Sequence, residues 1–436
     1  MIKKIELKNL SGFGRDFTAD IGDSAAKKRV NFASDGESLS DGLTFSEAKF
    51  GETGDSLPFP EDYQADYFFA ARTPAGERII VAGEGYIFVA DPLRPEDGFT
   101  RTEAYYSGGL CFANVDLGGN PCCAIVSDVG TMYLYDGESF SAYPCEAGVL
   151  SAIGFSGRLA LVTSDKAVLS AEGAPYDFSA GEGYSFDLGY EFCAKKAAKY
   201  QNEIIIAGVR GICKLGRSDY GSEFRVRPVA SEGERFLPET LFAGGEYAYI
   251  LSERGLATYN GVGLGFSHEE ISDTVGAGLG AFIWNGKYHA VLKTPENAHK
   301  RLIYAFGKDV EAYDLPIVST CIGGDGENVY AFVDGVNAVC LLGGKQTHPF
   351  PRRVFRTSET DFGVNGQKTL TEFSLRTLRD VRLIITVDGK KKAFRIIGGS
   401  GRRRITPFLK GEIFSFEIGC ELPSSCISAV RMEIEY

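Results

Sequence analysis

Short apolar runs, separated by small or polar turn residues, recur along most of the chain. Each unit begins with a turn at glycine or asparagine, continues into an apolar run such as Ile204–Ile206, and reaches a second tight turn before another run. Successive first turns are 43, 38, 45, 43, 41 and 40 residues apart, at Gly76, Gly119, Gly157, Asn202, Gly245, Gly286 and Gly326. A period this regular indicates a repeat architecture.

Each unit is predicted to be an antiparallel β-meander. The second turn contains Gly85, Gly130, Gly211 or Gly255, and we expect positive φ at the glycines of both turns and at Asn202, as two-residue hairpins require. Strand candidates also precede the first turns, for example at 66–72, 110–116, 195–200 and 281–285. Three or four strands every 40 to 45 residues is typical of one propeller blade. The pattern predicts an all-β chain with a seven-bladed β-propeller over residues 61–350.

Stacking of blades explains why the middle strands are continuously apolar. A lone meander is marginally stable because its second face stays in water, so blades must pack on their neighbours. Two unrelated hairpin-rich β-sandwiches are the alternative interpretation, and a single Trp argues against the Trp-Asp repeat subtype. We expect residues 1–60 to contribute strands to the propeller, since pairing of terminal strands removes an exposed edge.

The rhythm changes after the last unit. Residues 351–367 are predicted to be a linker, because this part of the chain is rich in proline and charge and lacks an apolar period. From Lys368 onward apolar and polar positions alternate, with Asp388-Gly389 as a hairpin turn. One apolar and one polar face predict a small β-sandwich or jelly-roll-like domain over residues 368–436.

Composition supports a folded chain with many turns. Of 436 residues, 54 are glycine, 44% are hydrophobic and 24% are charged, which is globular apart from the excess of glycine. The sequence has neither an apolar window long enough to span a membrane nor the apolar core of a signal peptide at its start. We therefore expect a soluble chain, not exported by the Sec pathway, whose ten cysteines are reduced and buried.

Charge is distributed unevenly along the chain. The net charge of −12 opposes general affinity for DNA or anionic membranes. Residues 351–436 carry 5 Lys and 11 Arg against 10 acidic residues, or +6, which leaves −18 for residues 1–350. This imbalance indicates two parts with different surfaces.

Two basic triplets in the C-terminal part are the candidate partner-docking cluster: Lys390, Lys391, Lys392, Arg402, Arg403 and Arg404. We interpret them first as solvated charges that keep sheet edges from pairing. Recognition of phosphate or nucleic acid and docking to the acidic propeller of the same or another chain remain alternatives.

Motifs for catalysis are missing from the sequence. The four histidines lack a paired metal-ligand spacing, and neither a Cys/His zinc pattern nor a GxSxG, Walker or DxDxDG motif occurs. GDGEN at 324–328 fits the first turn of the last unit instead. A catalytic pair cannot be selected from 58 acidic residues without a measured separation. We expect no enzymatic activity, no metal and no cofactor, and name no catalytic residue.

The C-terminal residues resemble a module of known virion proteins. The stretch from Phe373 to Gly419, followed by SCISAVRMEIEY, is similar to the C-terminal module of propeller-containing virion proteins of tailed phages and prophages of Firmicutes. The shared features are a strand, a charged hairpin, an Arg-containing loop, a strand at Phe414–Gly419 that reads F-x-F-x-I-G where the module has F-x-F-x-I-x-G, and a final strand from Ile427. The propeller is shared only as an architecture. The resemblance implies a structural component of the neck or tail, without an active site.

Together these observations predict a non-enzymatic structural protein of a tailed-phage or prophage virion, a protein-protein interaction scaffold at the head-tail junction or tail. Expected partners are portal, adaptor or tail subunits, met as several copies in a symmetric assembly that forms in the host cytoplasm. Membrane and nucleic acid are not expected as partners, and a receptor glycan remains open. The alternative is a carbohydrate-binding or glycoside-cleaving propeller, and a third hypothesis is an intracellular interaction hub of a host.

Overall fold

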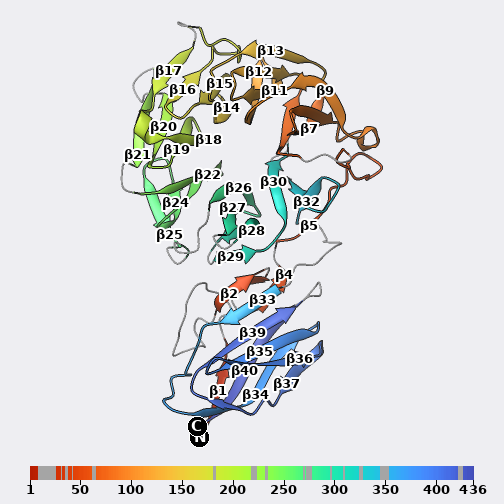
Figure 1. Ribbon diagram of the computed structural model, residues 1–436, viewed down its shortest axis with the longest axis vertical. Coiled ribbons are helices and arrows are strands. Elements are labelled where there is room, and N and C mark those ends of the chain that lie inside the picture. The colour runs from red at the N-terminus through yellow and green to blue at the C-terminus, as the bar shows by residue number, and fades with distance from the viewer. Residues whose placement is uncertain are drawn as a thin grey trace. The chain divides into compact units, whose positions relative to one another are not determined.

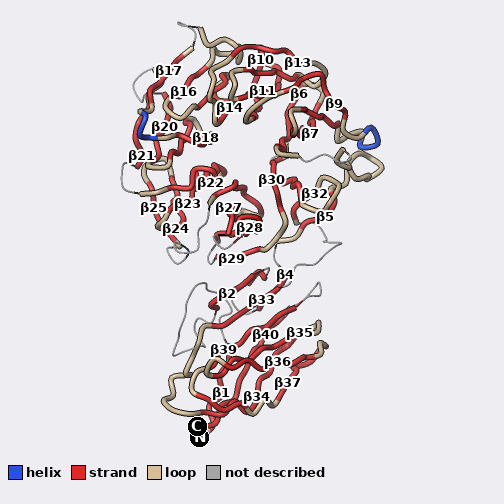
Figure 2. Tube along the Cα trace, in the orientation of Figure 1, coloured by secondary structure: helices blue, strands red, loops and turns tan. Residues whose placement is uncertain are grey.

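A computed structural model describes most of the chain, and its regular structure is almost entirely β-strand (Figures 1 and 2). The described residues are 1–7, 26–30, 32–34, 38–41, 43–60, 65–179, 183–217, 223–230, 234–268, 271, 277–294, 297–307, 310–323, 328–343, 353–420 and 426–436. Within them, helix is confined to two short 3-10 turns, η1 (Pro95–Asp97) and η2 (Tyr190–Phe192). The all-β prediction is confirmed.

The chain divides into two compact units. We call residues 47–300 with 316–342 the propeller unit, and residues 1–46 with 301–315 and 343–436 the terminal unit. The propeller unit carries 20 Lys and Arg against 38 Asp and Glu, a net charge of −18, and the terminal unit carries 26 against 20, or +6. The two units therefore carry net charges of opposite sign.

The propeller unit is built from antiparallel sheets in which successive strands pair in sequence order. The first sheet contains β6 (Tyr67–Thr73), β7 (Gly76–Gly83), β8 (Tyr86–Ala90) and β9 (Thr100–Tyr105), and the second contains β10 (Leu110–Leu117), β11 (Asn120–Ser127), β12 (Thr131–Tyr135) and β13 (Phe140–Pro144). The third contains β14 (Ser151–Phe155), β15 (Arg158–Val162), β16 (Lys166–Leu169) and β17 (Tyr184–Asp187), and the fourth contains β18 (Ala194–Tyr200), β19 (Glu203–Gly208), β20 (Gly211–Arg217) and β21 (Phe224–Ala230). The fifth contains β22 (Phe236–Gly244), β23 (Tyr247–Ser252), β24 (Gly255–Tyr259) and β25 (Leu264–Ser267). Next come the paired strands β26 (Gly278–Trp284) and β27 (Lys287–Thr294), and then a sheet of β30 (Ile317–Ile322), β31 (Val329–Val333), β32 (Cys340–Leu342) and β5 (Phe45–Glu47).

The first strands of these sheets form a ring (Figure 1). β6, β10, β14, β18, β22, β26 and β30 contact one another in that order, and β30 contacts β6 again. Continuously buried second strands lie between their neighbours, for example Ile204 to Ala207 in β19, because both faces of a sheet are covered by the next sheets in the ring. The fold is a β-propeller, and its sheets follow one another around the ring in the order of the predicted repeat units.

The turns follow the predicted chemistry, with two exceptions. Gly76 and Gly157 in first turns, and Gly85 and Gly130 in second turns, have positive φ values between 70° and 103°. In the turn of the fourth sheet, however, Gln201 and not Asn202 takes the left-handed conformation, with φ 50°. Gly211 is likewise not among the positive-φ residues. Gly326 lies outside the described residues.

An N-terminal segment joins the last sheet of the ring to the first. The Ala48 amide donates to the Val339 carbonyl (2.8 Å), and the Val339 amide donates to the Leu57 carbonyl (3.0 Å). Phe59 packs edge-on against Phe332, with ring centroids 4.8 Å apart. Leu57 and Phe59 are buried together with Phe68 of the first sheet. Residues 48–59 therefore close the ring by shared packing and hydrogen bonds.

The terminal unit has two sheets around one apolar core. One sheet has the order β3-β4-β40-β34-β37, with β1 on β40 and β38 on β34, and the other runs β28-β29-β2-β33-β39-β35-β36. Buried residues of both sheets share one cluster, which includes Phe373 and Met432 from the first and Phe355, Ile385 and Phe416 from the second. Two sheets that share a core form a sandwich. The strands are β1 (Ile2–Glu6), β2 (Ala26–Val30), β3 (Phe32–Ser34), β4 (Ser38–Asp41), β28 (Asn297–Phe306), β29 (Val310–Tyr313), β33 (Arg353–Thr357), β34 (Lys368–Thr377), β35 (Val381–Val387), β36 (Lys390–Ile396), β37 (Gly399–Ile405), β38 (Leu409–Gly411), β39 (Phe414–Cys420) and β40 (Ile427–Glu435).

The domain boundaries differ from those predicted. β1 pairs antiparallel with β40 from Ile2 opposite Glu435 to Glu6 opposite Arg431, so the first residues belong with the last strand and not with the propeller. Residues 353–357, placed in a linker over 351–367, instead form β33 and pair with β39. The apolar period was hidden there because two of the three inward positions of β33 are polar, Arg353 and Thr357.

Candidate binding groove

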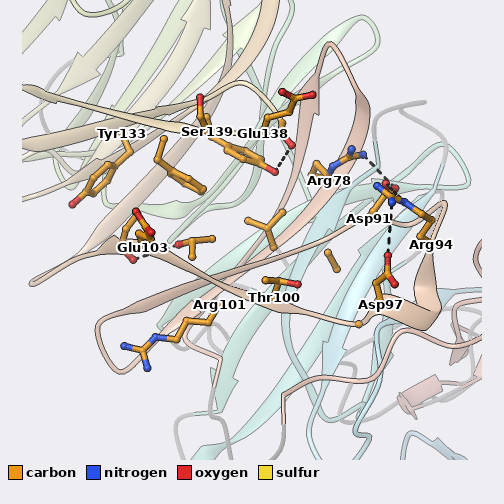
Figure 3. Close-up of a pocket in the computed structure, with 18 residues that line it drawn as sticks. Arg78, Asp91, Arg94, Asp97, Thr100, Arg101, Glu103, Tyr133, Glu138 and Ser139 are labelled. Carbon is orange, nitrogen blue, oxygen red and sulfur yellow. Dashed lines mark hydrogen bonds and ion pairs between the residues drawn. The ribbon is translucent and has the colours of Figure 1, made fainter.

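A groove of about 660 Å³ lies between the outer strands of the first two sheets of the propeller unit (Figure 3). One wall comes from β8 and β9 and the other from β12, β13 and the turn that joins them. β9 and β13 are the last strands of their sheets in the described part of the chain. The groove is therefore open where the two sheets end.

Arg78 forms a fixed support inside the groove. Its Nη1 lies 3.2 Å from Asp91 Oδ1 and also donates to the Glu77 carbonyl (2.9 Å) and the Ala75 carbonyl (3.2 Å). The Arg78 side chain is only 9% exposed. A buried guanidinium is tolerated when its charge and donors are satisfied, so this residue holds the wall in place.

Aromatic rings cover the opposite wall. Tyr135 stacks on Phe140 with centroids 4.5 Å apart, and Tyr133 meets Phe140 edge-on at 6.3 Å. The Tyr135 hydroxyl donates to the Gly137 carbonyl (2.9 Å). Burial raises the pKa of Tyr135, and the nearby Arg78 charge opposes that shift. The phenol is therefore neutral at physiological pH and serves as a packing and hydrogen-bonding surface.

The rim carries charges of both signs. Arg94 lies 3.4 Å from Asp91 Oδ2 and 3.9 Å from Asp97, and Arg101 covers the Tyr86 ring at 3.6 Å. Figure 3 shows these arginines on the β8–β9 side. The rim arginines are thus already engaged with neighbouring carboxylates or with a ring.

The carboxylates of Glu103 and Glu138 stand on the exposed rim. The turn that carries Glu138 is held by Asp136, whose Oδ1 accepts the Glu138 and Ser139 amides (2.8 and 2.7 Å). Although its slight burial favours the neutral form, these hydrogen bonds lower the pKa of Asp136. A preformed groove with an aromatic wall and a rim that carries exposed carboxylates beside arginines is suited to bind a partner segment.

Sequence reasoning missed this groove because its residues come from two different repeats. A signal was nevertheless present in the repeated Tyr-Asx-Gly pattern at 135–137 and 259–261. The Tyr259 hydroxyl donates to the Gly261 carbonyl (2.7 Å), as Tyr135 does to Gly137. Tyr259 also reaches Glu203 on the preceding sheet (3.2 Å). The pattern marks the end of a third strand that packs on the sheet before it.

The two predicted basic triplets lie on two consecutive edge strands of the terminal unit. Lys390, Lys391 and Lys392 begin β36, directly after the Asp388-Gly389 turn, whose φ values of 48° and 78° confirm the predicted hairpin. Arg402, Arg403 and Arg404 lie in β37, which contacts β36. Each strand is the last of its own sheet. All six side chains are exposed except Arg402, which is half-buried.

Part of this cluster is tied to neighbouring groups. Arg404 Nη1 lies 3.5 Å from Glu372 Oε2, and Arg403 donates to the Gly398 carbonyl (3.2 Å). Lys392 Nζ lies 5.5 Å from the centroid of the Phe394 ring. These are surface contacts of modest strength, which an incoming anion can replace.

The cysteine thiols and the potential metal-ligand side chains are the remaining candidates for chemistry in the described ranges. Six of the ten cysteines are buried, and burial raises the pKa of the Cys111 thiol to about 11 and that of Cys213 to about 12. Such thiols are poor nucleophiles. Across the described ranges, His, Cys, Asp and Glu side chains form no group of three that could hold a metal ion. Those ranges likewise contain no helix long and apolar enough to cross a membrane.

Solved structures similar to this chain are found at low sequence identity. No protein-family model and no curated protein matches it. Similar solved structures include BamB from Moraxella catarrhalis (13% identity, TM-score 0.41, covering 70% of this chain and 99% of that chain). Others are YCF48 bound to a D1 peptide (9%, 0.43, 68% and 97%) and the β-propeller domain of Cps50 (Swd1) from Myceliophteria thermophila (13%, 0.43, 64% and 97%). At such identities no function is carried over.

Proposed function

We propose that this chain is a non-enzymatic protein-interaction scaffold whose propeller binds a partner segment in the groove between its first two sheets. The groove itself carries the proposal. Its volume of about 660 Å³ lies within the range of preformed ligand sites, and its rings offer rigid contact area at a low cost in conformational entropy. Its arginines are held by carboxylates, backbone carbonyls or a ring, an arrangement suited to binding rather than to proton transfer.

We further propose that the scaffold is a structural component of a tailed-phage or prophage virion, at the head-tail junction or tail. The resemblance of residues 373–419 and 425–436 to the C-terminal module of such proteins supports this role. The combination of a propeller with an appended two-sheet unit supports it as well. Portal, adaptor and tail subunits are the partners that this role requires.

The test uses the purified full chain and particles from its source. We expect the immobilised chain to retain at least one portal, adaptor or tail protein encoded at its own locus, and mass spectrometry to find the chain in purified particles. Retention of none of them, with particles that lack the chain, would overturn the virion role. A glycan array is run in parallel, because glycan binding of micromolar affinity would favour the carbohydrate-binding alternative.

A further inference from the structure

In the terminal unit, two lysines of the edge strand β36 lie on the side of the sheet that faces the core. On β36, Lys390 lies opposite Val387 and Lys392 opposite Ile385. Both partners are buried in the core, and directly opposite residues of a sheet share a face. The two lysines are therefore on the core-facing side of an edge strand, where they remain exposed because β36 is the last strand of its sheet.

The facing sheet repeats this arrangement. Arg403 on β37 lies opposite Leu375, which is fully buried in the same core. β36 and β37 are joined by two residues, Ile397 and Gly398, and each ends its own sheet, so Arg403 and the two lysines lie on the core-facing sides of two consecutive edge strands. We call Lys390, Lys392 and Arg403 the basic seam.

Like charges also lie opposite each other on the outward faces of the same two edge strands. Arg382 lies directly opposite Arg395, and Arg376 directly opposite Arg402. Like charges in such positions are destabilising. Asp380 neutralises one of the four, through Arg395 Nη2 at 2.7 Å.

The propeller unit contains a surface of matching sign. Residues 102–157, which include the whole second sheet, contain six acidic residues and neither lysine nor arginine. Asp116, Asp136 and Glu146 are exposed, and so are Glu103 and Glu138 on the rim of the groove. The charged residues of this stretch are thus all acidic, and it borders the groove whose rim also carries Arg94 and Arg101, beside the aromatic wall formed by Tyr133 and Phe140.

We infer that the basic seam of one copy docks in the groove and on the acidic second sheet of another copy. The inference rests on the proposed function in taking the groove as a protein-binding site. Lysine heads would meet the carboxylates of Glu103 and Glu138, and their stems and charges would lie on the rings. The opposite net charges of the two units, −18 and +6, favour this pairing over contact between like units. Because the two surfaces differ, the contact is heterologous and generates a ring or an open chain of copies.

Full-length variants in which the charges of the seam or of the groove are reversed test the inference. Sedimentation of the wild type over a concentration series should show association at low salt that high salt reverses, because exposed charges are screened. The Lys390→Glu/Lys392→Glu/Arg403→Glu variant and the Glu103→Lys/Glu138→Lys variant should each raise the dissociation constant about tenfold or more. An equimolar mixture of the two variants should associate again, since the acidic seam of one then matches the basic groove of the other.

A matched control separates the interface from net charge. Arg217→Glu/Arg225→Glu/Arg235→Glu changes the charge by the same amount at exposed cations of the propeller unit away from the groove and should leave the association unchanged. Thermal melting must show that all variants are folded like the wild type. The inference would be overturned if the seam and groove variants associate as the wild type does, or if an equimolar mixture of the two variants fails to associate.

The two proposals fail in distinguishable ways. A chain that stays monomeric at every concentration and salt, yet retains a portal, adaptor or tail protein, overturns self-docking and leaves the scaffold role in place. A monomer that retains none of them overturns both. Binding of duplex DNA that the seam variant abolishes, without self-association, would assign the seam to nucleic acid and overturn the inference.

Discussion

At the scale of single residues, glycine sets the spacing between adjacent sheets of the propeller. Gly154 lies in β14, and a Cβ atom at this position would come within 2.0 Å of the Asn114 carbonyl oxygen in β10. Asn114 in turn accepts the Arg72 amide (2.8 Å) and donates to the Ala70 carbonyl of β6 (3.2 Å). At Gly154 the strand β14 therefore approaches the backbone of β10 closely, and the Asn114 side chain links β10 to the backbone of β6.

Gly154→Ala should destabilise the chain by about 1–3 kcal/mol, the usual cost of overpacking. The matched control is Gly280→Ala in the inner strand β26, where nothing lies within 4 Å of the added Cβ. That change should be neutral or slightly stabilising, because glycine is unfavourable within a strand. Urea unfolding of both variants checks the prediction, and equal midpoints would contradict it.

Asp380 predicts a pH dependence of the terminal unit. Its pKa is lowered because its carboxylate accepts the Gly398 amide (3.0 Å) and pairs with Arg395. The folded pKa therefore lies below the unfolded value of about 3.9. Its contribution to stability is complete above the unfolded value and is lost as pH falls through the folded value.

Asp380→Asn should therefore lower the urea midpoint at neutral pH, and this deficit should shrink as the pH falls below the unfolded pKa of about 3.9. Unfolding of both proteins is measured across that range. A deficit that stays constant down to the lowest pH would show that the charge of Asp380 does not contribute.

At the scale of elements, closure of the ring depends on a segment remote in sequence from the strands it joins. Phe59 is 4% exposed and packs on Phe332, Phe99 and Phe68 with centroids 4.8, 5.7 and 6.4 Å away. Phe332 belongs to the last sheet and Phe68 to the first. One side chain thus fills the joint between the two ends of the propeller.

Phe59→Ala should cost about 3–5 kcal/mol, as expected for removing a buried aromatic side chain. Leu93→Ala, at a propeller position that is 72% exposed, should cost little. Calorimetric melting of the two variants against the wild type measures the difference. If both variants melt together with the wild type, residues 48–59 do not hold the ring closed.

The elements that could be predicted are those whose physics is local. Hairpins at Gly85 and Gly130 and the Asp388-Gly389 turn follow from residues that tolerate positive φ. β33 was missed because Arg353 and Thr357 occupy buried positions that a hydrophobic pattern assigns to apolar residues. The partner of β1 was missed for a different reason, since a strand's pattern records which face is buried and not which distant strand lies beside it.

The candidate site shows the same limit more strongly. The basic triplets were visible in the sequence, but their meeting on two edge strands depends on the order of strands in two sheets. The groove depends on Arg78 and Tyr135, which lie in different repeats and meet only when sheets stack. A repeat pattern predicts that such joints exist and does not say which of them stays open.

At the scale of the whole molecule, the chain combines two units of opposite net charge, −18 for the propeller unit and +6 for the terminal unit. Each offers one surface suited to a protein partner: the acidic groove beside Tyr133 and the basic seam at Lys390, Lys392 and Arg403. A scaffold of this kind acts by binding partners through shape and charge, so the affinity of the groove for a protein partner is its central property.

The most direct measurement is therefore the dissociation constant between the full chain and a protein of its own locus that it retains. Tyr133→Ala, which removes one ring of the groove wall, should raise this constant about tenfold or more, as loss of a central aromatic contact does. Tyr247→Ala, an equivalent loss at a partly exposed ring of the fifth sheet, should leave it unchanged. Equal affinity for wild type and Tyr133→Ala, with both variants folded, would contradict the assignment of the groove as the binding site.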